Sequence, residues 1–451
     1  MKLFPQDNDV VLYETGFDDD VLERKATSKQ LSELVERIED PIVLALDDMW
    51  GSGKTFFLKR WVAAHTAENN GTATTIYFDA FENDYLTDPL ISIITAVSAR
   101  LPNAQAATVK KWKSVAAKLA KPALGIALSV ATFGAKQHLD EIGDVIADAA
   151  NGEAKDAAQD LFDIEKDRKE AVGDFRNLLS DLTQKSAAPI VIVVDELDRC
   201  RPDYALTVLE VIKHFFSVPK VHFILSINGK ALENSVKARY GAEIDAESYL
   251  RKFINVSFSL PRTIGERGEV NVVAKYASKL ISDMKLPKRV SDRCVSIMKC
   301  VAKGRDVSLR DVGKILSKVA LLPNAVHEKN YVDGYIDVLC ALLVTSVVDP
   351  GLHVKLVSGD AQTSELRAYL FAPKEKTAQR IGGNYNSEYD HEVTIWLATI
   401  VFCCGAEELN DVEDLPDWSE QMGGRFDNFG ISDVKSIAKG IQKDWVELFR
   451  I

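Results

Sequence analysis

The chain has 451 residues, 46% hydrophobic and 27% charged, which is the composition of an ordinary folded protein rather than a disordered one. That length is too great for one compact core, so two or three domains are expected. The formal net charge of −12 argues against a broad positive surface for nucleic acid.

The cysteines and the first residues indicate a cellular compartment. Six cysteines occur without a C-x-x-C pair, which favours reduced thiols. The segment from Met1 to Asp7 turns polar and acidic at once, which argues against a secretory signal peptide. We therefore expect a cytoplasmic protein, with peripheral membrane contact as an open alternative.

An acidic N-terminal arm, residues 1–22, precedes the first predicted domain, which we place at 23–262. Apolar residues at helical spacing from Leu31 to Ile38 predict a helix near its start. Thr27 followed three residues later by Gln30 predicts that Thr27 is the N-cap.

The most informative segment is D-D-M-W-G-S-G-K-T, residues 47–55, which follows the apolar run 42–46 and precedes a helical pattern. A strand, a glycine-rich turn and a helix opening with Lys-Thr form the context of a phosphate-binding loop. Lys54 is expected at the β- and γ-phosphates, and the Thr55 hydroxyl at Mg²⁺. The predicted nucleotide-binding residues of this segment are Trp50, Gly51, Ser52, Gly53, Lys54, Thr55 and Phe56.

This loop departs from the pattern G-x-x-x-x-G-K-[ST] at its first position, where Asp48 replaces glycine. Aspartate tolerates unusual turn dihedrals better than most residues, so the loop can still form. Its carboxylate would repel a triphosphate unless it points away. The competing interpretation is an ordinary strand-to-helix turn.

A second strand is predicted at 73–78, and a helix follows from Pro89. Residues 103–172 then read as a helical insertion, alanine-rich at first and acidic later. Within it, the apolar segment 122–135 is shorter than a membrane-spanning helix requires and suits a buried or interfacial helix better. Membrane contact through this segment stays open but is not favoured.

The apolar run 189–194 predicts a central parallel strand that ends in Asp195 and Glu196. Asp195 is expected to bind Mg²⁺ together with Thr55, and Glu196 to activate the attacking water as a general base. A further strand, 222–227, ends at Asn228, which is expected to order that water in preference to Ser226. A turn-forming Asn-Gly is the alternative.

Four motifs resemble those of the KAP family of P-loop NTPases, a branch of the additional-strand class related to AAA+ and STAND proteins. They are W-G-S-G-K-T at 50–55, F-D-A-F-E-N-D at 78–84, V-D-E-L-D-R-C at 194–200 and Y-L-R-K-F-I at 249–254. The resemblance covers roughly residues 20–320. It implies a three-layer α/β/α parallel sheet with a helical insertion, followed by an all-α C-terminal region.

The resemblance also implies functional arginines. Arg251 lies where an arginine finger would be presented to a neighbouring subunit, although pairing with Glu247 explains it equally well. Arg310 corresponds to a nucleotide sensor in a helical lid, 263–322, and Arg305 is a less favoured substitute. The remaining helical region, 323–451, would contact a second copy or a partner protein.

The predicted function is that of an ATP-hydrolysing molecular switch with ATP and Mg²⁺ as cofactors. The resemblance further implies bacterial anti-phage defence. The alternative is a nucleotide-binding signalling or scaffold protein with little turnover, for which association with a membrane is left open. The choice between ATP and GTP is left open by these residues.

Overall fold

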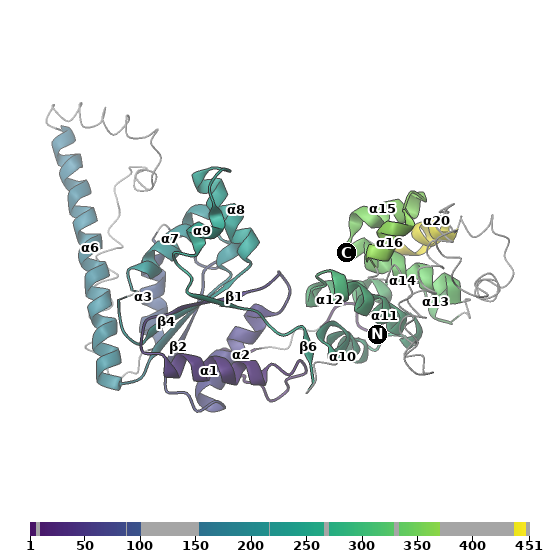
Figure 1. Ribbon diagram of the computed structural model, residues 1–451, viewed down its shortest axis with the longest axis horizontal. Coiled ribbons are helices and arrows are strands. Elements are labelled where there is room, and N and C mark those ends of the chain that lie inside the picture. The colour runs from purple at the N-terminus through teal and green to yellow at the C-terminus, as the bar shows by residue number, and fades with distance from the viewer. Residues whose placement is uncertain are drawn as a thin grey trace, which may run out of the picture.

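The computed structural model describes residues 1–5, 10–86, 88–100, 153–215, 217–265, 270–328, 333–369 and 437–447. Two bodies are visible in Figure 1: a sheet domain (residues 10–260) and a helical domain (residues 263–447). The apolar segment 122–135 lies outside the described residues. Across the described ranges, no helix combines the length and apolar character that crossing a bilayer requires.

The main sheet has five parallel strands in the order β2-β3-β4-β1-β5. They are β1 (Val43–Asp47), β2 (Thr74–Asp79), β3 (Ile190–Asp195), β4 (Val221–Ile227) and β5 (Val256–Phe258). The four strands predicted from apolar runs are confirmed. Three-residue β5 was missed because it is too short to show a period.

The strand order decides where the predicted motifs meet. β4 lies between β1, which leads into the glycine-rich loop, and β3, which ends in the acidic pair. Because all five strands are parallel, their carboxyl ends open at one edge, where ligands bind in such sheets. A small antiparallel pair, β6 (Thr263–Ile264) and β7 (Val270–Asn271), marks the junction with the helical domain.

Helices cover both faces of the sheet. The first helices are α1 (Lys25–Arg37), α2 (Lys54–Ala67), α3 (Pro89–Arg100), α6 (Glu153–Ser186), α7 (Pro202–Lys213), α8 (Gly229–Tyr240) and α9 (Ala246–Leu250). Along β1, Leu44 and Leu46 pack with α1 and α2, whereas Val43 and Ala45 face the core shared with α3, α6, α7 and α8. This alternation follows from the two-residue period of a strand and confirms the predicted α/β/α fold.

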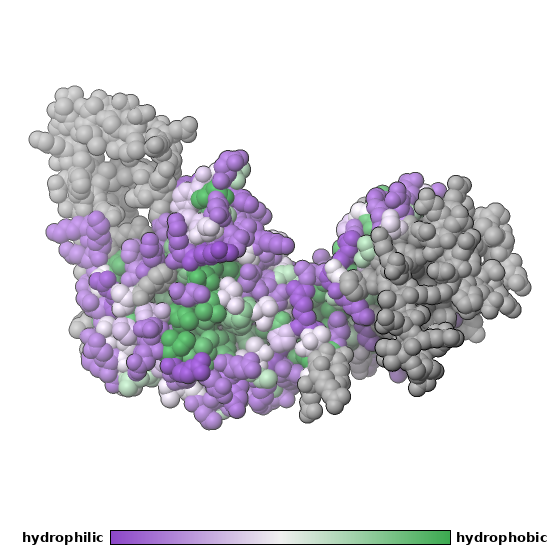
Figure 2. Space-filling view, viewed as in Figure 1, coloured by the Kyte–Doolittle hydropathy of each residue, from purple (hydrophilic) through white to green (hydrophobic). Residues whose placement is uncertain are grey.

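In the space-filling view, apolar residues gather over the sheet, and the outer surface of the surrounding helices is mostly hydrophilic (Figure 2).

The predicted N-cap of the first helix is wrong. α1 begins at Lys25, and Arg24 rather than Thr27 occupies the capping position. The helix already starts there because the Ser28 N–H bonds the Arg24 carbonyl at 2.9 Å. The Arg24 side chain is bound to the carbonyls of Ser52 and Gly53, and the cap lies three residues earlier than the cap motif suggests.

The helical domain is built around one apolar core. Its helices are α10 (Val272–Met284), α11 (Lys288–Gly304), α12 (Leu309–Ala320), α13 (Asn324–Glu328), α14 (Asp333–Val348), α15 (Pro350–Ser358), α16 (Thr363–Tyr369) and α20 (Ile437–Ile441), which a π-helical turn (Gln442–Val446) extends. Strongly apolar α14 packs on α11 and α12. The core therefore continues through the boundary predicted at residue 322.

Candidate nucleotide-binding site

The glycine-rich loop connects β1 to α2 at the carboxyl edge of the sheet. Gly51 and Gly53 have φ angles of 81° and 90°, in the left-handed region that favours glycine. The Lys54 ammonium folds back onto the loop and donates to the carbonyls of Asp48 (2.6 Å) and Met49 (3.0 Å). Burial lowers the pKa of Lys54, and nearby carboxylates oppose that shift.

The acidic pair at the end of β3 lies across from this loop. Glu196 adopts a left-handed conformation (φ 59°), and its carboxylate accepts a 2.9 Å hydrogen bond from the Thr55 hydroxyl. Its other oxygen lies 2.5 Å from Arg199 Nε. Burial raises the pKa of Glu196, the Thr55 hydrogen bond opposes that shift, and the charge of Asp195 adds to it.

Asp195 directly precedes Glu196 at the end of β3 and is fully buried. Its oxygens accept hydrogen bonds from the Glu196 N–H (2.9 Å) and from the Tyr77 hydroxyl (2.7 Å). Tyr77, on neighbouring β2, was not predicted as a site residue, because only the strand order reveals that it faces Asp195.

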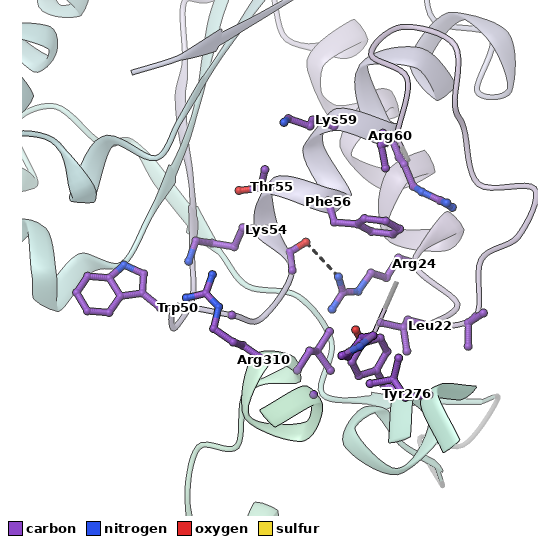
Figure 3. Close-up of a pocket in the computed structure, with 18 of the residues that line it drawn as sticks. Leu22, Arg24, Trp50, Lys54, Thr55, Phe56, Lys59, Arg60, Tyr276 and Arg310 are labelled. Carbon is purple, nitrogen blue, oxygen red and sulfur yellow. Dashed lines mark hydrogen bonds between the residues drawn. The ribbon is translucent and has the colours of Figure 1, made fainter. Parts of the chain in front are cut away.

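Lys54, Thr55 and Glu196 line a cavity of about 730 Å³ between the sheet domain, the N-terminal arm and the helical domain (Figure 3). Volumes of this size are typical of ligand sites. Most of the predicted residues line it: Trp50, Gly51, Gly53, Lys54, Thr55, Phe56, Glu196 and Arg310. Leu22 and Tyr276 lie together on the far side of Arg24 from Lys54 and provide apolar surface (Figure 3).

Trp50 is tied to the acidic side of the cavity. Its indole N–H donates to Asp198, while the side chain stays half exposed at the cavity wall. Burial raises the pKa of Asp198, and the Trp50 hydrogen bond opposes that shift. Asp198 belongs to the V-D-E-L-D-R-C motif at 194–200 but was not predicted to line the site.

Arg310 reaches the cavity from the start of α12. Ser308 and Asp311 form a capping box there, and the Leu309 N–H donates to the Gly51 carbonyl at 3.0 Å. The Arg310 side chain points toward Lys54 and Trp50 (Figure 3). Arg305 instead pairs with Asp349 at 2.5 Å, away from this cavity.

Four predicted residues do not line the cavity, and buried Asp195 is one of them. The Asn228 side chain accepts from the Ala231 N–H (3.3 Å) as the N-cap of α8, whereas Ser226, the residue set aside, lines the cavity. Arg251 is 72% exposed and pairs with Glu247, as the competing interpretation proposed. The Ser52 hydroxyl is buried on the opposite side of the loop.

Arg24 is the main loop-contacting residue that the sequence did not reveal. Its guanidinium is buried and donates to the carbonyls of Ser52 (2.8 Å) and Gly53 (3.2 Å). Burial lowers its pKa to about 10, against the opposing charges of Asp20 and Asp48. A lone arginine before a helix carries no sequence signal for such a role.

Oxygen ligands for Mg²⁺ are present around Thr55, Asp195 and Glu196, and hard oxygen donors are what this cation prefers. Among the described residues, no group of three or more His, Cys, Asp or Glu forms a complete protein cage. This arrangement fits a cation that would be bound partly by nucleotide phosphates, as is usual for Mg²⁺.

The chain matches a protein-family model over most of its length and is only weakly similar to solved structures. The solved structures most similar in shape include two of the Aeropyrum pernix ORC2 protein, as ADPNP-ADP complexes and in the ADP form. They have TM-scores of 0.36 and 0.34 at 11% identity, covering 93% and 94% of this chain and 94% and 98% of theirs. No curated protein sequence matches. Residues 24–326 match the KAP family P-loop domain, and the chain therefore belongs to the KAP family of P-loop NTPases.

Proposed function

We propose that this protein is a Mg²⁺-dependent ATPase that acts as a nucleotide-driven switch. The observation that carries the proposal is the shared cavity: Lys54, Thr55 and Glu196 all line it, and Thr55 bonds Glu196 at 2.9 Å. A phosphate-binding lysine and a carboxylate able to take a proton from water are thus within reach of one triphosphate.

Each residue then has a defined task. The Lys54 ammonium would exchange the carbonyls of Asp48 and Met49 for phosphate oxygens. Thr55 and Asp195 would hold Mg²⁺, which neutralises phosphate charge when bound. Glu196 would accept the proton of the attacking water.

Arg310 would report the state of the nucleotide, because it joins the cavity to α12 of the helical domain.

The test compares MgATP turnover by wild type and by Glu196→Gln, with affinity measured by calorimetry. Loss of a general base lowers turnover by about 10²- to 10⁴-fold and leaves binding intact. Lys54→Ala should lose binding itself. Glu33→Gln, a 65% exposed glutamate on α1, is the matched control and should match wild type. Equal turnover in wild type and Glu196→Gln would refute hydrolysis at this site.

A second candidate is a nucleotide-binding scaffold with little turnover. Both Glu196 oxygens already have a partner, Thr55 for one and Arg199 at 2.5 Å for the other, so an attacking water would compete with these donors for the base. A partner that displaces Arg199 would convert such a resting state into an active one. Tight MgATP binding with equally idle wild type and Glu196→Gln would favour this candidate.

Assembly is the next element of the proposal. Arg251 is 72% exposed and lies outside the cavity of its own chain, so an arginine-finger role requires a second copy. Mass measured with and without MgATP should then show an increase on nucleotide binding. A monomer under both conditions would exclude donation of Arg251 between subunits.

The biological setting we propose is bacterial anti-phage defence, which rests on the family resemblance alone. Plating efficiency of phage on cells expressing wild type or Glu196→Gln tests it. Protection by wild type and loss of protection in the variant would support it, and equal plaque counts on all strains would refute it.

A further inference from the structure

Asp48, which stands where the P-loop pattern has glycine, turns its carboxylate away from the nucleotide cavity. Its side chain is 4% exposed and lines a separate cavity of about 50 Å³ behind the loop. One oxygen accepts from the Met49 N–H at 2.8 Å. The negative charge is therefore held on the back of the loop rather than opposite phosphate.

Arg262 provides the counter-charge and lies at the junction of the two domains. Its Nη2 is 3.6 Å from Asp48 Oδ1, an ion pair without a hydrogen bond. Its other terminal nitrogen bonds Asp306, two residues before the cap of α12. Its backbone carbonyl accepts from the Val272 N–H (3.0 Å) at the start of α10.

We propose that Asp48, Arg262 and Asp306 form a charge bridge through which the helical domain holds the P-loop in place and retards nucleotide release. The inference rests on the proposed nucleotide binding. Asp48 is a positioning residue in this scheme, since it faces away from the site of the phosphates.

The bridge runs beside a second link between the same parts. The Leu309 N–H donates to the Gly51 carbonyl, and Arg310 follows directly and lines the nucleotide cavity. A movement of α12 away from the loop would break this backbone bond and, at the same time, separate Asp306 from Arg262. Charge at residue 48 thus adds to the resistance against opening.

Burial makes the two ends of the bridge unequal. Arg262 is 56% exposed and is solvated by water when Asp48 is removed. Asp48 without Arg262 is a buried carboxylate that has lost its cation, which is the more costly loss. Arg24 and Lys54 also lie near Asp48, but both donate to backbone carbonyls of the loop instead.

The experiment measures release of a fluorescent ATP analogue from the full chain by stopped flow. Arg262→Gln should accelerate release about three- to tenfold, and Asp48→Asn by less. The double variant should release more slowly than Arg262→Gln alone, because the unpaired carboxylate is gone. Arg289→Gln, which breaks the exposed Arg289–Asp333 pair in the helical domain, is the matched control and should match wild type.

Asp48→Gly separates the bridge from the view that Asp48 merely damages the loop. A damaged loop would be repaired by glycine and would release nucleotide more slowly than wild type, which would overturn the inference. The bridge predicts faster release. Single-turnover hydrolysis of bound ATP should stay near the wild-type rate in Asp48→Asn, because that residue touches no reacting atom. A fall in this hydrolysis rate as large as the change in nucleotide release would overturn the positioning role.

A nucleotide-free measurement keeps this inference separate from the proposed function. If wild type does not bind the analogue, the proposed function is refuted, and so is the role of the bridge in retaining nucleotide. Unfolding midpoints of Asp48→Asn, Arg262→Gln and the double variant still judge the bridge: non-additive changes support it, and additive changes overturn it.

Discussion

The buried guanidinium of Arg24 and the backbone of Gly53 are fitted to each other. Arg24 Nη1 donates to the Gly53 carbonyl at 3.2 Å, and a Cβ atom on Gly53 would lie 2.7 Å from that same nitrogen. The P-loop is therefore held by a cavity-lining side chain that belongs to the segment before α1. Its conformation depends on a residue 29 positions away in sequence.

Gly53→Ala should destabilise the loop. Alanine at a φ of 90° is strained by roughly 1–2 kcal/mol, and its methyl group would displace Arg24. We expect a lower free energy of unfolding and weaker MgATP binding. Gly173→Ala is the matched control, because that helical glycine has open space around it and should gain about 0.5–1 kcal/mol. Equal effects at the two glycines would contradict the fit.

Removal of the Arg24 side chain should have a similar result by a different route. Arg24→Gln leaves the carbonyls of Ser52 and Gly53 without their charged donor, which costs about 1–3 kcal/mol in unfolding free energy. Arg24→Lys should recover little, because one ammonium cannot reproduce the two-pronged geometry. Denaturant titration measures both, and full recovery by lysine would show that charge alone matters.

Turnover should depend on pH through Glu196. Burial raises the pKa of its carboxyl. The acid limb of the rate profile should therefore lie at a pH above the pKa of an ordinary glutamate, about 4.3. The charge of Arg199 works in the opposite direction. Arg199→Gln should therefore move the limb to higher pH, as measured by MgATP turnover between about pH 5 and 8. An unmoved limb would assign it to another group.

Stability should fall on mild acidification because of His65. This buried ring contacts Ser32 (2.9 Å) and Glu36 (3.0 Å), and burial lowers its pKa despite the Glu36 charge. The folded chain then binds fewer protons than the unfolded chain, so stability is present above about pH 6.5 and is lost as pH falls below it. The unfolding midpoint should decline from pH 7.5 to 5.5, and less steeply in His65→Gln. Parallel slopes would exclude His65 as the source.

Local patterns were sufficient where the physics is local. Apolar runs of strand length predicted four of the five strands of the main sheet. The glycines at 51 and 53 predicted the loop, because glycine adopts those φ angles at little cost. The N-cap at Thr27 was wrong because the Arg24 contact fixes the backbone earlier. The sequence did not reveal that the Asn228 side chain caps α8 while Ser226 lines the cavity.

The sequence by itself determined the class of this protein, since a glycine-rich Lys-Thr turn and an apolar strand ending in Asp-Glu carry phosphate and acid chemistry in short segments. Only the tertiary structure decided which distant groups meet: Tyr77 with Asp195, Arg24 with the loop, and Asp48 with Arg262. Those pairings depend on strand order and on how the two domains are joined, and such long-range contacts leave no periodic trace along the chain.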